Sequence, residues 1–83
     1  MPEITRFYGI TIRIFFRGEH NPPHIHAIYG EDVAVISIHT CEVLEGYLPP
    51  KASAMVKEWV ISNKSELLKM WETQQFRKLS PLE

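Results

Sequence analysis

Hydrophobic and polar residues alternate with a period of two along residues 10–16 of this 83-residue chain. The apolar positions of the pattern are Ile10, Ile12, Ile14 and Phe16. Successive side chains of a strand point to opposite faces, so the alternation predicts a strand with one face on a core. Gly18 and the Pro22-Pro23 pair then interrupt the pattern and predict a loop, because proline donates no hydrogen bond and fixes φ.

Two β-rich runs at residues 24–29 and 33–38 are separated by a short turn sequence that begins with Gly30. This spacing predicts a β-hairpin with Gly30 at a positive φ angle. The cross-strand pairs expected from a two-residue turn are Tyr29 with Asp32 and His26 with Val35. The hairpin supplies the second and third strands of the expected sheet.

A fourth strand is expected at residues 43–48, although Gly46 weakens the strand pattern there. Pro50 is tolerated in a first helical turn and predicts a helix over residues 50–62. The apolar residues of that helix recur at helical spacing, at Ala52, Met55, Val56, Trp59 and Val60. A second helix is predicted over residues 65–75.

The second helix has a candidate N-cap in Asn63, with Glu66 three residues further on. Residues after Phe76 have no periodic pattern and are expected to form a frayed tail. The sequence therefore predicts an α+β fold, in which an antiparallel sheet of three to four strands precedes two helices packed on one face. A chain of residues 1–83 has room for a single domain.

Charge divides the chain into an acidic middle and basic flanks. No lysine or arginine occurs between Gly18 and Pro50, where there are five acidic residues. The flanks carry Arg6, Arg13 and Arg17, and the helices carry Lys51, Lys57, Lys64 and Lys69. Contact with nucleic acid is therefore expected to use the flanks and helix lysines, if it occurs at all.

The single Cys41 cannot form an internal disulfide, which favours a reducing compartment and a cytoplasmic location. No apolar run approaches the roughly 18 residues that a membrane helix needs, so no membrane association is expected. A nucleophile elbow, a phosphate-binding glycine loop and an HExxH helix are all absent from the sequence. These absences leave acyl transfer, nucleotide binding and zincin chemistry without a motif.

Three of the four histidines lie between Glu19 and His26, and this clustering is the main candidate for chemistry. In a strand, His24 and His26 share a face with their bases about 7 Å apart, which permits both rings to bind one ion. Glu19 or His20 could supply a third ligand for a divalent transition metal. Two alternatives remain: a polar outer face with structural histidines, and proton transfer by imidazole. The fourth histidine, His39, joins the group only if the strand register allows.

Several motifs in order resemble a family of small bacterial proteins known as domain of unknown function 4160. The motifs are Pro2-Glu3-Ile4, Arg6 to Ile10, Pro22 to Ala27, Tyr29 to Glu31, Gly46 with Leu48-Pro49, and Glu58-Trp59. The resemblance covers about residues 2–72, and departs from the family at Cys41-Glu42, where Gly-Glu is more usual. It implies a prokaryotic protein often encoded beside a second short gene, of the kind suspected in toxin-antitoxin-like pairs. It implies no catalytic residue.

Two functional hypotheses follow from the sequence. The first is a binding or regulatory component of a two-gene system, which contacts a protein partner through its sheet or forms a homo-oligomer. The second is a small metal- or histidine-dependent hydrolase, such as an RNA-cleaving toxin, with His24 and His26 as the catalytic candidates.

Overall fold

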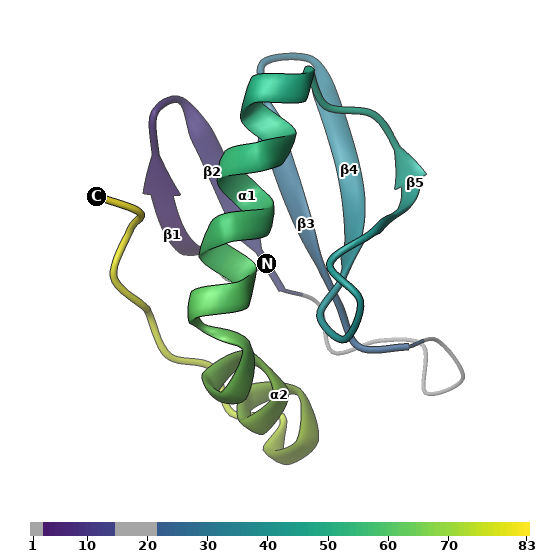
Figure 1. The fold of residues 1–83 in the computed structure, drawn as a ribbon. Helices are drawn as coiled ribbons and strands as arrows, with labels where there is room; N and C mark the ends of the chain where they lie inside the picture. The colour runs from purple at the N-terminus through teal and green to yellow at the C-terminus, as the bar shows by residue number, and fades with distance from the viewer. Residues whose placement is uncertain (1–2, 15–21) are drawn as a thin grey trace.

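The structure is a computed structural model that describes residues 3–14 and 22–83. Its elements are β1 (Glu3–Phe7), β2 (Ile10–Arg13), β3 (His24–Tyr29), β4 (Asp32–Ser37), β5 (Val43–Gly46), α1 (Pro50–Ser62) and α2 (Lys64–Thr73). The strands form one antiparallel sheet in the order β1-β2-β3-β4-β5 (Figure 1). The predicted α+β class is confirmed, with five strands instead of three or four.

The hairpin of β3 and β4 has the register that the sequence predicts. Tyr29 pairs with Asp32 and His26 pairs with Val35. Gly30 has a φ angle of 62°, the left-handed conformation that a tight hairpin turn requires. Because strand side chains alternate, this register fixes which residues of β3 face the helices.

Strand β1 is the element that the sequence prediction missed. It joins β2 through a two-residue turn in which Tyr8 and Gly9 both have positive φ angles, 47° and 79°. Tyrosine rarely adopts this conformation, so the turn has no conventional sequence signal. A bulge between Glu3 and Thr5 further disturbs the alternation of the strand.

The other strand limits are close to prediction but not identical. β2 ends at Arg13 instead of residue 16, and residues 15–21 lie outside the described part. β5 ends at Gly46 instead of residue 48, because Gly46 has a φ angle of 81° and turns the chain towards α1. α2 begins one residue earlier than predicted and ends at Thr73, two residues short of the predicted end.

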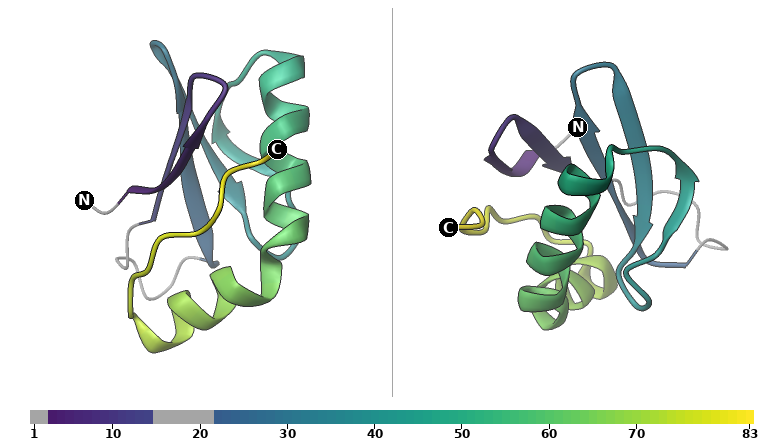
Figure 2. Two further views of the ribbon diagram at one scale, coloured as in Figure 1. Left: turned by 90° about the vertical axis from the view of Figure 1, so that its left-hand side faces the viewer. Right: turned by 45° about the horizontal axis from the view of Figure 1, so that its top comes forward.

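Helix α1 packs on one face of the sheet, whereas α2 crosses beneath one end of the strands (Figure 2). The core between the sheet and α1 contains Ile12, Ile25, Ile36, Val56 and Trp59, all essentially inaccessible to solvent. On the opposite face of β3 and β4, Trp71 of α2 contacts His24 at the start of β3. Helix α2 contributes Leu67 and Met70 to the same core.

The predicted N-cap at Asn63 has a different role in the structure. Its side-chain Nδ2 donates to the carbonyl of Trp59 at 2.9 Å and so caps the end of α1. No side-chain capping bond forms at the start of α2. Glu66, the expected partner in the capping box, instead forms an ion pair with Arg77.

The segment after α2 is packed against the fold and is not the frayed tail that was predicted. The amide of Leu79 donates to the carbonyl of Ile4 at 3.2 Å. The indole Nε1 of Trp59 donates to the carbonyl of Ser80 at 2.8 Å. Leu79 and Leu82 also pack against the core. Residues 75–83 thus follow the sheet edge formed by β1 (Figure 2).

Candidate functional site

His24 and His26 lie side by side on the face of β3 that points away from α1. The residues between and after them, Ile25 and Ala27, are fully buried on the opposite, core face. The two imidazole rings have centroids 5.4 Å apart and planes inclined at 64°. The predicted sharing of a face is confirmed, and the two rings are in edge-type contact.

The ring of His24 is held in place by two contacts. Its Nδ1 lies 2.8 Å from the carbonyl oxygen of Pro22, and a carbonyl only accepts, so Nδ1 carries a hydrogen. The ring also packs on Trp71 of α2, with centroids 5.0 Å apart. In the neutral form of His24 the lone pair is therefore on Nε2, the atom that metals and protons would meet.

His26 is partly buried, and its environment favours the neutral ring. Burial lowers the pKa of His26 from its ordinary value, and the charge of His24 acts in the same direction. The carboxylate of Glu45 raises the pKa of His26 and only partly opposes these effects. A neutral imidazole is the form that accepts a proton or binds a metal ion.

The two rings open onto a cleft of about 420 Å³. Its walls are Pro22, His24, His26, Val35, Leu44 and Glu45. Glu45 reaches the site because it pairs with Val35, which in turn pairs with His26, so the three residues form one row across the sheet. Sequence reasoning did not single out Glu45, because a register shift in the β4–β5 pairing determines its position.

The remaining predicted ligands are not brought together with this pair. Glu19 and His20 lie outside the described residues. His39 is exposed after β4, does not line the cleft, and its carbonyl accepts a bond from Lys64 Nζ at 2.7 Å. Within residues 3–14 and 22–83, the side chains as they stand contain no group of three or more that could hold a metal ion.

The structure describes two of the three arginines in the N-terminal basic flank. Arg6 forms an ion pair with Glu3 on the same strand, at 2.9 Å. Arg13 is half-buried and pairs with His26 across β2 and β3. Arg17 lies outside the described residues. Arg6 and Arg13 therefore point to no free cationic surface.

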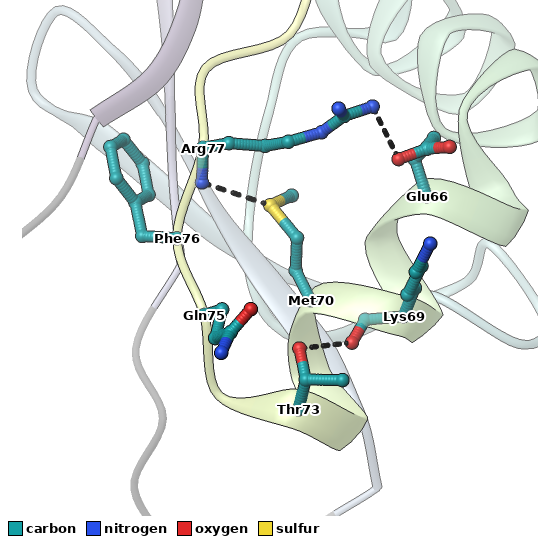
Figure 3. Close-up of a pocket in the computed structure, with 7 residues that line it drawn as sticks. All are labelled: Glu66, Lys69, Met70, Thr73, Gln75, Phe76 and Arg77. Carbon is teal, nitrogen blue, oxygen red and sulfur yellow. Dashed lines mark hydrogen bonds and ion pairs between the residues drawn. The ribbon is translucent and has the colours of Figure 1, made fainter.

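A second pocket, of about 390 Å³, lies between α2 and the tail (Figure 3). Here Arg77 extends across the pocket to Glu66, and the Arg77 amide donates to the sulfur of Met70 at 3.4 Å. Thr73 closes the end of the helix by bonding to the Lys69 carbonyl at 2.8 Å. The contacts of Arg77 with Glu66 and Met70 hold the tail against α2. We therefore interpret this pocket as part of the packing between the tail and α2.

The two edges of the sheet differ in how much of them is covered. The tail lies along β1, where Leu79 bonds to the backbone. All four residues of β5 are exposed at the other edge. The large apolar side chains that are exposed on and beside β5 are Val33, Val43, Leu44 and Tyr47. This surface, named the β5 surface below, adjoins the histidine cleft through Leu44 and Glu45.

Comparison with known proteins gives one match. Residues 9–72 match the sequence model of a family described as a domain of unknown function (DUF4160). No curated protein and no solved structure matches the chain. In the described residues, no helix is long and apolar enough to cross a membrane.

Proposed function

The chain belongs to the DUF4160 family, and on this premise we propose that it is the binding component of a bacterial, toxin-antitoxin-like two-gene system. Its partner is the protein encoded by the neighbouring short gene, and the contact is made through the β5 surface. The observation that carries the proposal is the uncovered edge strand beside exposed apolar side chains. An exposed strand edge offers unpaired backbone groups to a partner strand.

The charges around β5 indicate what the partner surface must contain. Glu42 and Glu45 lie at this edge, and Glu31 and Asp32 lie at the tip of the neighbouring hairpin. No lysine or arginine occurs in this half of the sheet. A partner segment with alternating apolar and basic residues therefore fits, since its apolar side chains meet Leu44 and its cations meet the carboxylates.

Affinity measurements on two matched variants test this proposal. Leu44→Lys places a charge in the centre of the β5 surface, where we expect a loss of at least tenfold in affinity for the neighbouring gene product. Tyr8→Lys, at the distant β1–β2 turn, is the control and leaves the affinity unchanged. Equal effects of the two substitutions, or a protein that stays monomeric and binds nothing from the adjacent gene, would contradict the proposal.

Three further measurements test the other partners that the sequence allows and the proposed location. Light scattering on the isolated protein detects a homo-oligomer, which would occupy β5 with a second copy of the chain. Salt-dependent binding of RNA, lost in Arg13→Gln, would instead support a nucleic-acid partner. A cytoplasmic site of action is part of the proposal because Cys41 is a free thiol, and cell fractionation tests it.

A second candidate function is a histidine-dependent hydrolase, and the convergence of two rings on one cleft supports it. In such an enzyme neutral His26 accepts a proton from water or a ribose hydroxyl, while His24, when protonated, donates to the leaving group. His26→Gln keeps a polar side chain but cannot accept that proton at neutral pH. Growth inhibition or RNA cleavage that is unchanged in this variant would end the hydrolase hypothesis.

A further inference from the structure

Glu45 brings a carboxylate from β5 to the cleft that contains the two histidines of β3. Glu45 and His26 line the same cleft from the two sides of Val35, because the three residues form one row across β5, β4 and β3. Two imidazoles and one carboxylate form a ligand set that zinc, cobalt and iron(II) accept in proteins.

The spacing of the rings agrees with joint coordination of one ion. With metal–nitrogen bonds of about 2.1 Å and a nitrogen about 1.1 Å from its ring centroid, each centroid is about 3.2 Å from the ion. At a tetrahedral angle, two such centroids lie about 5.2 Å apart. The observed separation of His24 and His26 is 5.4 Å. The ring separation is therefore close to that of two imidazoles bound to one ion.

The hydrogen bond of His24 matches the surroundings of a metal-binding histidine. In such a histidine, the N–H of the second ring nitrogen donates to a carbonyl or carboxylate, which orients the ring and fixes the tautomer. His24 Nδ1 donates to the Pro22 carbonyl in this manner, and Trp71 packs against the ring. The ring is thus oriented before any ion arrives.

Glu45 is exposed on a strand of four residues, so its side chain can rotate towards the rings. In the described residues the side chains as they stand do not form a three-ligand group. We propose that a divalent transition metal ion binds in the cleft to His24, His26 and a rotated Glu45, with the remaining positions open to solvent. This site goes beyond partner binding and requires neither the partner nor hydrolysis.

Titration with Co²⁺ tests the site on the isolated full chain, prepared without a histidine tag and freed of metal with a chelator. We expect one ion per chain, an absorption band in the visible range, and displacement by Zn²⁺. His26→Gln abolishes the band, and Glu45→Gln weakens binding at least tenfold. The matched controls Glu42→Gln and His39→Gln leave binding unchanged, because neither residue lines the cleft.

The variants also locate the site if it differs from this assignment. Glu45 is exposed, so Glu45→Gln folds, and circular dichroism checks that His26→Gln does as well. Absence of Co²⁺ binding, or binding that persists in His26→Gln, overturns the site. Binding that is weakened by Glu19→Gln or His20→Gln but not by Glu45→Gln overturns the role of β5. Each result is independent of whether the neighbouring gene product binds.

Discussion

The rest of the chain covers one edge strand of this sheet, β1, and leaves the other, β5, exposed. At β1, the C-terminal tail bonds to Ile4 and packs Leu79 against the core. At β5, no part of the described chain lies along the outer edge, and every residue is exposed. Because an exposed edge invites indiscriminate pairing, proteins usually cover it or blunt it. This fold covers one edge with its own chain.

The open edge at β5 has features that limit pairing with other strands, although no segment of the described chain covers it. β5 has only four residues, a register shift in its pairing with β4, and two nearby glutamates at positions 42 and 45. These features discourage pairing with an arbitrary strand. The exposed apolar side chains Val43 and Leu44 still favour a partner that matches them in shape and charge. The comparison separates a covered edge at β1 from an open edge at β5, and the proposed partner would use the open one.

The largest expected effect concerns the residue that ends β5. A Cβ atom at Gly46 would lie 2.0 Å from the carbonyl oxygen of Val33, and Gly46 also has a positive φ angle. We expect Gly46→Ala to lower the free energy of unfolding by about 3 kcal/mol or more, from backbone strain and the steric conflict together. Urea denaturation measures the change.

Gly30→Ala is the matched control for this prediction. Gly30 also has a positive φ angle, but no atom lies within 4 Å of the position that a Cβ would occupy. Strain alone should cost about 1 kcal/mol there. Similar losses in the two alanine variants would show that the close approach of Gly46 to the Val33 carbonyl adds no cost beyond backbone strain.

Removal of the tail should open the β1 edge. A chain that ends at Gln74 loses the Leu79 bond to Ile4 and the partly buried side chains of Leu79 and Leu82. From the apolar area lost, we expect the free energy of unfolding to fall by about 2–3 kcal/mol. The newly exposed strand should also make the protein self-associate, which analytical ultracentrifugation detects. A truncated chain that is as stable and as monomeric as the full chain would contradict the role assigned to the tail.

The histidine cleft between the edges predicts a pH effect on stability. Burial and the charge of His24 lower the pKa of His26 below 6.5, while Glu45 partly offsets them. Arg13 is the cross-strand neighbour on β2. The unfolded chain therefore binds a proton at a pH where folded His26 does not, so stability falls as the pH drops through about 6.5 and levels off below the folded pKa. One group contributes at most about 1.4 kcal/mol per pH unit.

Comparison of the wild type with His26→Gln isolates this contribution, with a chelator present to keep metal ions away. Urea midpoints at pH 7.5 and pH 5.5 should differ more for the wild type than for the variant. Equal pH dependence in both proteins would mean that His26 titrates normally in the fold.

The smallest effect concerns the turn that leads into β5. Cys41 has a φ angle of 64°, a conformation that favours glycine. Cys41→Gly and Cys41→Ala both remove the thiol and differ only in the Cβ atom. We expect the glycine variant to be more stable by about 0.5–1 kcal/mol, which thermal denaturation resolves. If Cys41→Ala were instead more stable than Cys41→Gly, the turn would not be strained at residue 41.

The sequence predicts best where local rules determine the structure. Gly30 and the alternation on either side determine the β3–β4 hairpin and its register, and hence the shared face of His24 and His26. Pro50 marks the start of α1 correctly. These features depend on residues that are close together in the chain.

Long-range contacts determine what the sequence did not predict. Strand β1 is short, and the turn that follows it has no recognisable signal, because Tyr8 is an unusual residue at a positive φ angle. The tail has no helical or strand periodicity, and its position depends on Ile4 and Trp59, which are far away in the sequence. Glu45 reaches the cleft only because the β4–β5 pairing shifts register. Neither alternation nor helical spacing carries this information.

Chemical-shift mapping during titration with the neighbouring gene product tests the different roles of the two edges most directly. If β5 serves recognition, the backbone amide signals of residues 43–47 and 33–35 shift and become protected from hydrogen exchange. The signals of β1 and of residues 75–83 remain unchanged. Shifts confined to β1 and the tail, with β5 unaffected, would contradict the account.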